Sequence, residues 1–175
     1  MEEASRQVET HKFEDDGRIP NNPELPLLMY PGALDGSDDL DAQFRALLEE
    51  NGWGGAWRNG VFPYHHYHST SHEVLGVVAG GARLNFGGAS GVTLEVGEGD
   101  VVVIPAGVGH KNEGSHAGFS VIGAYPRGQE SYDLRTGEEG ERPEVLENIR
   151  KVSLPEKDPV FGEDGPLTRN WRHRS

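Results

Sequence analysis

Short apolar runs broken by glycines dominate the middle of the chain, from residue 53 to residue 125. Breaks such as Gly60, Gly80-Gly81 and Gly87-Gly88 separate stretches rich in valine, leucine and isoleucine. Breaks this frequent are typical of strands joined by tight turns. The pattern predicts an all-β core over residues 53–125, built as a closed sheet or a sandwich.

A helical pattern precedes this core. Apolar side chains in residues 37–51 recur at helical spacing, at Leu40, Phe44, Leu47 and Leu48. Ser37 can cap the start, acidic residues follow it at the positive end of the helix dipole, and Asn51-Gly52 can end the helix. We expect its apolar face to cover the sheet.

The two flanks are less regular. Residues 1–18 are polar and are expected to be loosely ordered, whereas the apolar run 27–30 lies among prolines and predicts an extended segment at a sheet edge, packed on the barrel or on a partner chain. Residues 126–175 are rich in charge, glycine and proline but retain regular apolar anchors. We interpret them as an arm packed on the barrel, with a short helix near residues 144–150, so that residues 1–175 form a single domain.

Composition narrows the possible functions. The chain has 175 residues and a formal net charge of -13, which opposes binding to nucleic acid. It has no cysteine, so a metal would need nitrogen and oxygen ligands. We see no signal-peptide core and no apolar stretch of the roughly twenty residues that a membrane span needs. We expect a soluble cytoplasmic protein that binds neither membrane nor nucleic acid.

A cluster of histidines carries the clearest chemistry. His65, His66, His68 and His72 fall within eight residues, and Glu73 follows. Side chains alternate faces along a strand, so His66 and His68 share one face while His65 and Tyr67 point the other way. Glu73 begins a return strand and can place its carboxylate beside the pair, with Leu75 and Val77 on the same face.

A further histidine, His110, follows the run 101–104 and a turn that contains Pro105, Gly107 and Gly109. Imidazoles with a carboxylate suit borderline divalent metals. We therefore predict a site for one divalent ion (Fe, Mn, Ni, Cu or Zn) at His66, His68, Glu73 and His110. We interpret His65 and His72 as surface or supporting residues, since parity turns His65 away.

These residues resemble the two sequence motifs of the cupins. The first motif is matched at every position, by Gly60, His66, His68, Glu73 and Gly80. The second is matched by Gly99, Pro105, Gly107 and His110, but Gly114 stands where the motif has asparagine. That departure affects the support around the site more than the ligands, and the nearby Asn112 cannot simply replace the missing residue.

The likeness of the two motifs spans about residues 60–114. Over most of the chain, from Ile19-Pro20-Asn21-Asn22 to Gly123-Ala124-Tyr125-Pro126, the sequence is similar to the YjlB-type bacterial cupins, a group mostly described as uncharacterised. The resemblance implies a double-stranded β-helix, or jelly-roll barrel, with a few short peripheral helices. It also implies a homodimer.

Other side chains near the motifs have less specific interpretations. Tyr64 shares parity with His66 and is our candidate catalytic residue, as a proton donor or an orienting hydrogen bond. Arg58, Arg83 and Asn85 could orient a substrate, although an exposed strand face explains them as well. Barrel filling explains the remaining apolar positions. These are Phe62, Leu75, Val77, Val102, Ile104, Phe119 and Val121, whereas Trp53 and Trp57 are expected in the core.

Four ligands leave one or two positions open on iron, nickel or manganese, whereas a structural site is normally closed. Three functions for a small-molecule site follow. The resemblance implies a dioxygenase-like oxidoreductase acting on a small oxygenated substrate. A non-redox isomerase, lyase or decarboxylase, and a binding or sensing protein without catalysis, would use the same ligands.

Overall fold

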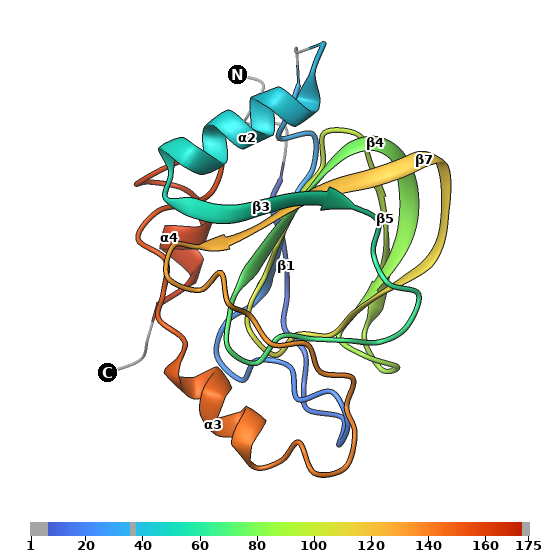
Figure 1. The fold of residues 1–175 in the computed structure, drawn as a ribbon, viewed down its shortest axis with the longest axis vertical. Helices are drawn as coiled ribbons and strands as arrows, with labels where there is room; N and C mark the ends of the chain where they lie inside the picture. The colour runs from blue at the N-terminus through green and yellow to red at the C-terminus, as the bar shows by residue number, and fades with distance from the viewer. Residues whose placement is uncertain (1–6, 36–37, 173–175) are drawn as a thin grey trace.

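Antiparallel strands form most of the protein. This computed structural model describes residues 7–35 and 38–172. Seven strands belong to one sheet in the order β1-β2-β6-β4-β7-β3, and β5 pairs with β4 (Figure 1). The strands are β1 (Glu9–His11), β2 (Leu27–Tyr30), β3 (Trp53–Asn59), β4 (Glu73–Phe86), β5 (Val92–Gly97), β6 (Val101–Ile104) and β7 (His110–Pro126). The helices are α2 (Leu40–Glu50), α3 (Glu144–Lys151) and α4 (Pro166–Asn170).

The long strands β4 and β7 run through both halves of the barrel. The first half of β4 lies between β6 and the end of β7, and its second half lies between β5 and the start of β7. The two strands bend together where their register shifts, near Gly80. Gly80 has φ +66°, and a Cβ there would lie 2.5 Å from the carbonyl oxygen of His116. The predicted all-β double-stranded β-helix with a few short helices is confirmed.

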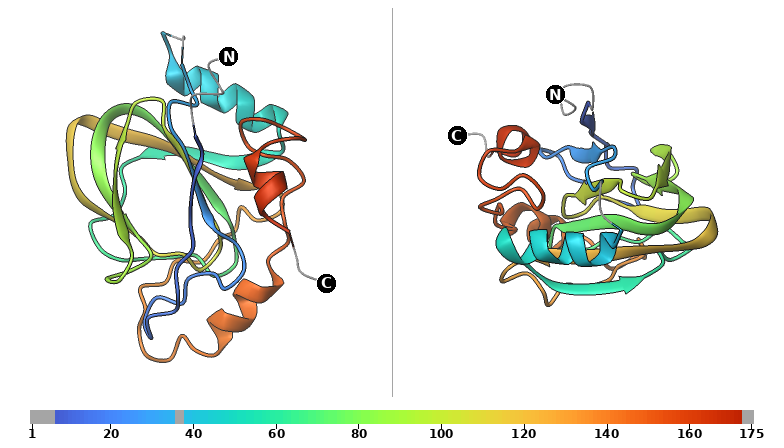
Figure 2. Two further views of the ribbon diagram at one scale, coloured as in Figure 1. Left: turned by 180° about the vertical axis from the view of Figure 1, so that it is seen from behind. Right: turned by 90° about the horizontal axis from the view of Figure 1, so that it is seen from above.

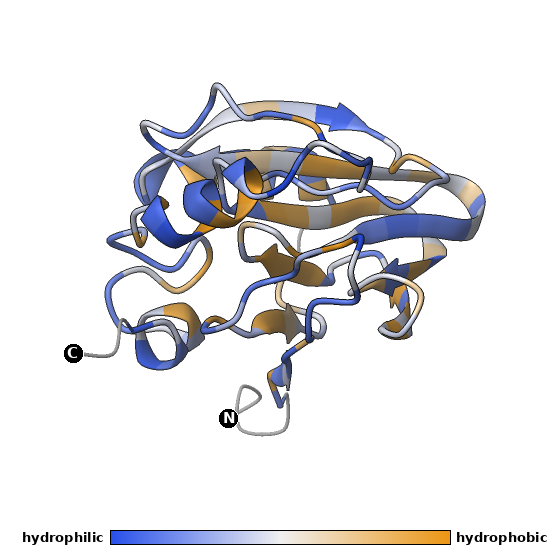
Figure 3. Cartoon of the chain, turned by 90° about the horizontal axis from the view of Figure 1, so that it is seen from below, coloured by the Kyte–Doolittle hydropathy of each residue, from blue (hydrophilic) through white to orange (hydrophobic). Residues whose placement is uncertain are grey.

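Alternation along the strands separates two cores. One alternate set of side chains, including Leu75, Val77 and Val102, fills the barrel interior. The other set, including Val74 and Val103, packs on the opposite face of the sheet. Figure 3 shows the hydrophobic colour concentrated along these strands. The predicted shared face of Leu75 and Val77 is confirmed.

The helix α2 covers the outer core. Phe44 and Leu48 are buried there, while Leu40 and Leu47 are partly buried against the same cluster. The expected cap Ser37 lies outside the described residues; instead the side chain of Asp39 accepts a hydrogen bond from the Ala42 amide at 3.0 Å. The helix therefore begins two residues later than a Ser37 cap would place it, and its predicted covering role is confirmed.

The N-terminal segment is more ordered than its polarity suggested. Residues 1–6 are outside the described part, but residues 9–11 form β1, which pairs with β2 (Figure 2). On its other side β2 pairs with β6, and all four of its residues are buried. The prediction that residues 27–30 lie at a sheet edge is therefore wrong. Pairing with β1 leaves β2 no open side for a strand of a second chain.

The segment after β7 returns across the barrel. Val145 and Ile149 of α3 are buried, as are Leu167 of α4 and Trp171. The Trp171 indole donates to the carbonyl of Pro26 at 2.8 Å, which joins this segment to the connection before β2. The helix expected near residues 144–150 is confirmed. Within the described residues, no helix is long and apolar enough to cross a membrane.

Candidate metal centre

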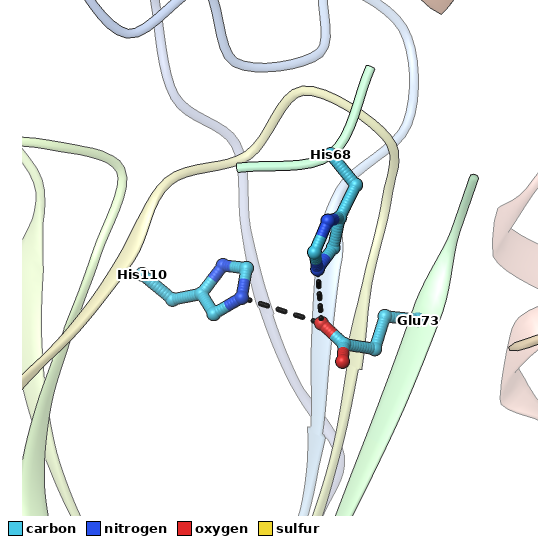
Figure 4. Close-up of side chains that lie close together, drawn as sticks. All are labelled: His68, Glu73 and His110. Carbon is cyan, nitrogen blue, oxygen red and sulfur yellow. Dashed lines mark ion pairs between the residues drawn. The ribbon is translucent and has the colours of Figure 1, made fainter. Parts of the chain in front are cut away.

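Three ligand-type side chains converge inside the barrel. His68 comes from the connection between β3 and β4, Glu73 is the first residue of β4, and His110 is the first residue of β7 (Figure 4). The Nε2 atoms of His68 and His110 each lie 3.3 Å from Glu73 Oε1. All three residues are buried, and their candidate ligand atoms lie within 4.8 Å of one another. This group could hold a metal ion.

Backbone carbonyls fix the orientation of each imidazole. The Nδ1 atom of His68 lies 2.5 Å from the Asp133 oxygen, and that of His110 lies 3.2 Å from the Val108 oxygen. A carbonyl only accepts hydrogen bonds, so each Nδ1 carries the proton. In a neutral imidazole the lone pair is then on Nε2, which faces Glu73. This is the arrangement in which a histidine binds a metal and donates its other N–H to the protein.

The spacing of the three atoms fits a shared cation. Glu73 Oε1 has no hydrogen-bond partner among the described residues, although both Nε2 atoms are near it. Two ligand atoms about 2.1 Å from one ion and at about 100° to each other are about 3.2 Å apart. Without a cation or a proton, nitrogen lone pairs would face a carboxylate at this distance in a buried site. The group therefore fits a divalent ion.

His66 lies beside this group but is not part of it. Its ring centroid is 4.1 Å from that of His110, and its Nδ1 lies 2.9 Å from the Tyr64 carbonyl oxygen. Burial and the neighbouring His110 lower the pKa of His66 to about 3. A neutral imidazole with Nε2 available for coordination follows at ordinary pH.

The electrostatics of the group favour a carboxylate anion. Burial alone would raise the pKa of Glu73, but the charge that His68 and His110 can carry outweighs burial and holds the pKa well below its usual range. Burial likewise lowers the pKa of His68, while the Glu73 carboxylate overrides it and raises that pKa. A cation can replace these protons as the counter-charge of Glu73.

A cavity of about 440 Å³ opens onto the group. Its size is in the range of small-molecule sites. Aromatic and apolar side chains form about half of its wall, and the candidate ligands are among the polar residues that line it. The lining residues are Trp57, Arg58, Asn59, Gly60, Val61, Phe62, Pro63, His66, His68, Glu73, Leu75, His110, Tyr125, Tyr132 and Leu134.

Two tyrosines that the sequence did not single out line this cavity. The Tyr125 hydroxyl donates to Glu73 Oε2 at 3.2 Å and accepts from the Trp57 indole at 2.8 Å. Tyr132 stacks on Tyr125 with centroids 4.3 Å apart and meets the edge of His68. Burial and the Glu73 charge raise the pKa of Tyr125, which keeps the phenol protonated. Trp57, expected in the core, packs partly buried against the barrel core and also forms part of the cavity wall.

The candidate Tyr64 lies further out. Its side chain is 43% exposed, stacks on Phe62 and is not among the lining residues, so its catalytic role stays a prediction. Phe62, expected to fill the barrel, is 47% exposed at the cavity mouth. The connection between β3 and β4 follows the surface there instead of continuing a strand, which carries both rings outward.

Strand parity separates the histidines as expected. His65 does not line the cavity, although its segment forms only an isolated bridge, not a regular strand. His72 is buried, not on the surface, and its Nδ1 accepts a hydrogen bond from the Ala106 amide at 2.9 Å. It contacts Trp171 with ring centroids 4.7 Å apart. His72 thus supports the turn before His110. Of the two expected roles, surface or supporting, it has the supporting one.

The polar candidates are divided between surface and interior. Arg58 reaches the cavity but its guanidinium binds Asp41 at 3.1 Å, and Arg83 pairs with the exposed Glu95. Asn85 is buried on β4 and does not line the cavity. An exposed strand face therefore explains Arg83, whereas it is wrong for the buried Asn85, and Arg58 lies at the cavity with its guanidinium paired to Asp41.

Gly114, the departure from the second motif, lies on β7 away from the ligands. A Cβ there would meet no atom within 4 Å, and its amide donates to the side chain of Asn112 at 2.8 Å. The Asn112 amide in turn donates to the Phe62 carbonyl at 2.9 Å. Asn112 thus braces the cavity mouth, while the four predicted ligands do not depend on position 114.

Comparison with known proteins gives one strong sequence match. No protein-family model matches the chain. An uncharacterized protein of Bacillus subtilis (strain 168), YjlB, is 45% identical over 166 residues, which cover 95% of this chain and 98% of YjlB.

Solved structures match more distantly. Procruciferin, an 11S globulin from Brassica napus, has a TM-score of 0.39 and 16% identity; the match covers 85% of this chain and 33% of procruciferin, so the chain spans about a third of that protein. Acireductone dioxygenase from Bacillus anthracis, with a cadmium ion in its active centre, has a TM-score of 0.37 and 16% identity, covering 67% of this chain and 76% of that one.

Proposed function

Because this chain belongs to the same family as YjlB of Bacillus subtilis and has the cupin fold, we propose that it is a mononuclear metal-dependent enzyme acting on a small oxygenated substrate. His66, His68, Glu73 and His110 hold one divalent ion in this proposal, with Fe, Mn, Ni, Cu and Zn as the candidates. One observation carries it. Two histidine Nε2 atoms, whose rings are each oriented by a carbonyl at Nδ1, lie 3.3 Å from Glu73 Oε1, which has no hydrogen bond among the described residues.

The favoured reaction class is dioxygenase-like. An Fe(II) ion at these residues would supply electrons to dioxygen and Lewis acidity toward the substrate oxygens. The protein's own side chains do the rest. Glu73 would contribute the single negative charge and the three histidines their Nε2 atoms, while Trp57 and Leu75 give the cavity wall apolar surface.

Tyr125 controls the second oxygen of the carboxylate. Since the indole of Trp57 can only donate, the phenol proton of Tyr125 points to Glu73 Oε2. Oε1, which faces the two Nε2 atoms, would then be the carboxylate oxygen available to hold an ion. Tyr64 stays our proposed hydrogen-bonding group for the part of a substrate that reaches the cavity mouth.

Dioxygen uptake tests the reaction class. The Fe(II)-loaded protein is screened against enolic, diketone-like and hydroxylated compounds, with the metal-free protein as control. We expect iron-dependent oxygen consumption coupled to product. Metal-dependent turnover under strict anaerobiosis, with no oxygen uptake, would refute it and establish the isomerase, lyase or decarboxylase alternative. Saturable binding without any product would establish the sensing alternative.

A protonated phenol beside the site favours the non-redox alternative as the second candidate. Tyr125 could donate a proton to a substrate carbanion or oxyanion. Its Tyr125→Phe variant would then lose turnover in the anaerobic assay, whereas a dioxygenase would keep measurable oxygen uptake.

A homodimer remains a prediction of the family resemblance, and a cytoplasmic location remains a prediction from the sequence. Since β1 and β6 flank β2, a dimer would have to use another surface. Light scattering of the purified chain measures its oligomeric state, and a monomer would contradict the prediction. The net charge of -13 continues to argue against nucleic acid as a partner.

A further inference from the structure

Exposed apolar side chains gather at the mouth of the metal cavity. Among the described residues, five large hydrophobic side chains are exposed, and four of them surround this opening: Phe62, Tyr64, Tyr132 and Leu134, at 47%, 43%, 39% and 46%. Phe62, Tyr132 and Leu134 line the cavity itself, and Tyr64 stacks on Phe62 at 5.1 Å. Exposed apolar groups concentrated at one concave place mark a binding site.

The four side chains form two walls. One wall is the stacked pair Phe62 and Tyr64, whose ring planes are 10° from parallel. Both rings also contact His66 in an edge-on arrangement. The other wall is Tyr132 and Leu134, in the segment that follows β7. Tyr132 stacks on Tyr125, which extends this wall into the cavity.

Each wall is attached to one of the histidines. The Tyr64 carbonyl accepts from His66 Nδ1 at 2.9 Å, and the Asp133 carbonyl accepts from His68 Nδ1 at 2.5 Å. The Asn112 amide also donates to the Phe62 carbonyl. The same two short segments therefore orient the histidines and carry the apolar walls, which fixes the distance between walls and ligands before anything binds.

Free charge is scarce between the walls. Apart from the candidate ligands, Arg58 is the one charged residue that lines the cavity among the described residues. Its guanidinium already binds Asp41 at 3.1 Å and the Ser120 hydroxyl at 3.0 Å. A substrate group lying there gains contact with rings and methyl groups, and the nearest charged side chain outside the ligand group is already paired.

From this arrangement we infer that the substrate joins a flat, uncharged, aromatic-like group to the oxygen atoms that reach the metal, and that the flat group lies between the Phe62–Tyr64 wall and the Tyr132–Leu134 wall. The inference rests on the proposed metal function and names its substrate class. A small molecule is favoured over a second chain because the apolar surface continues inward to Trp57 and Leu75, within a cavity of about 440 Å³.

Two chelators with the same metal-binding group test the inference. Benzohydroxamate and acetohydroxamate present the same pair of oxygens and differ in a phenyl ring against a methyl group. Calorimetric titration into the Zn²⁺-loaded protein should show benzohydroxamate binding at least about tenfold more tightly, as expected for a ring held between aromatic side chains. Cyclohexanecarbohydroxamate, which is apolar but not flat, should bind more weakly than benzohydroxamate.

Variants locate the preference. Phe62→Ala and Leu134→Ala, one on each wall, should each reduce the ratio of benzohydroxamate affinity to acetohydroxamate affinity to less than about threefold. The matched control is Phe161→Ala, which removes a ring that is 43% exposed but packs on Tyr30, away from the cavity. It should leave the ratio unchanged. Circular dichroism of each variant shows that it is folded.

The outcomes separate this inference from the metal proposal. A protein that retains stoichiometric Zn²⁺ by elemental analysis but binds the hydroxamates equally refutes the flat substrate alone. A protein that retains no Zn²⁺ refutes the metal proposal and this inference with it. If the two wall variants dissociate a dimer and leave the hydroxamate ratio intact, the walls form an interface between chains and the inference is wrong.

Discussion

Asp133→Asn tests whether the segment after β7 holds His68 in place. The carboxylate of Asp133 holds the connection between β3 and β4 near its end: Oδ1 accepts from the Ser69 and Thr70 backbone amides, and Oδ2 accepts from the Ser69 hydroxyl and from Arg135. Burial would raise the pKa of Asp133, but these hydrogen bonds hold it below its ordinary value. Its carbonyl meanwhile accepts from His68 Nδ1.

An asparagine at position 133 keeps an acceptor oxygen at the Oδ1 position and replaces Oδ2 with an amide nitrogen that cannot accept. The bonds at Oδ1 can persist, whereas an amide NH₂ at the Oδ2 position faces the Arg135 N–H and the hydroxyl of Ser69, which is fully buried. Hydrogen bonds to a charged group contribute about 1.5–3 kcal/mol each, and the partly exposed Arg135 pair contributes less. We therefore expect the free energy of unfolding to fall by about 2 kcal/mol.

Metal binding should suffer as well. Loosening the carbonyl that orients His68 is expected to weaken metal affinity about 10–100-fold. In excess Zn²⁺ the variant then loses a further ~1.4–2.7 kcal/mol relative to wild type. Urea unfolding with and without Zn²⁺ measures both terms.

The matched control is Asp164→Asn, in which the carboxylate pairs with Arg169 on the surface and is 88% exposed. It should change stability by less than about 0.5 kcal/mol and leave metal affinity unchanged. An Asp133→Asn protein with wild-type Zn²⁺ affinity would refute the idea that this segment positions a metal ligand.

Three further predictions concern other parts of the chain. His66→Ala should weaken metal binding without abolishing it, since His66 lies outside the tight three-residue group; competition titration with a chromophoric chelator measures this, and complete loss would contradict it. Gly123→Ala should reduce hydroxamate affinity and destabilise the fold by about 1–3 kcal/mol, because its Cβ would lie 2.3 Å from the Trp57 ring in the cavity wall; unchanged calorimetry would argue against it. The Arg142 hydrogen bonds lower the pKa of Asp15 below its ordinary value of 3.8. Their contribution to stability, about 0.5 kcal/mol, is therefore present above that pH and is lost as the pH falls through the lower pKa of the folded state. In acid unfolding, Asp15→Asn should be less stable than wild type above that range and equally stable only at the lowest pH.

Local periodicity predicted which faces carry the site. Alternation placed His66 and His68 toward the cavity and His65 away from it, and it placed Leu75 on the same face as Glu73. These relations depend on neighbours in sequence, where the two-residue period of an extended chain is sufficient. They held even though residues 64–72 form isolated bridges and turns, not a strand.

Local periodicity could not predict the contacts that form when the barrel closes and brings distant residues together. Tyr125 meets Glu73 across 52 positions, and Asp133 meets His68 across 65. Both contacts depend on the register of β7 with β4 and on the path of the chain after β7, which no local pattern encodes. The sequence contained one indication of these contacts. Apolar and aromatic residues recur after Tyr125 too regularly for a free linker, which indicated that this segment packs on the barrel.

The same limit explains the errors in the N-terminal half. Prolines around residues 27–30 indicated an edge strand, because proline disrupts pairing. The prolines flank the strand, however, and β1 supplies the outer pairing through a short polar segment that has no strand-like pattern of its own.

Metal stoichiometry measures the central claim most directly. Elemental analysis after reconstitution with Fe(II) or Zn²⁺ and removal of excess metal should find one divalent ion per wild-type chain. His65→Ala, which removes the neighbouring imidazole that does not line the cavity, should keep that ion, while His68→Ala should lose it. Equal metal content in wild type and His68→Ala, or none in either, would contradict the assignment of this cluster as a metal centre.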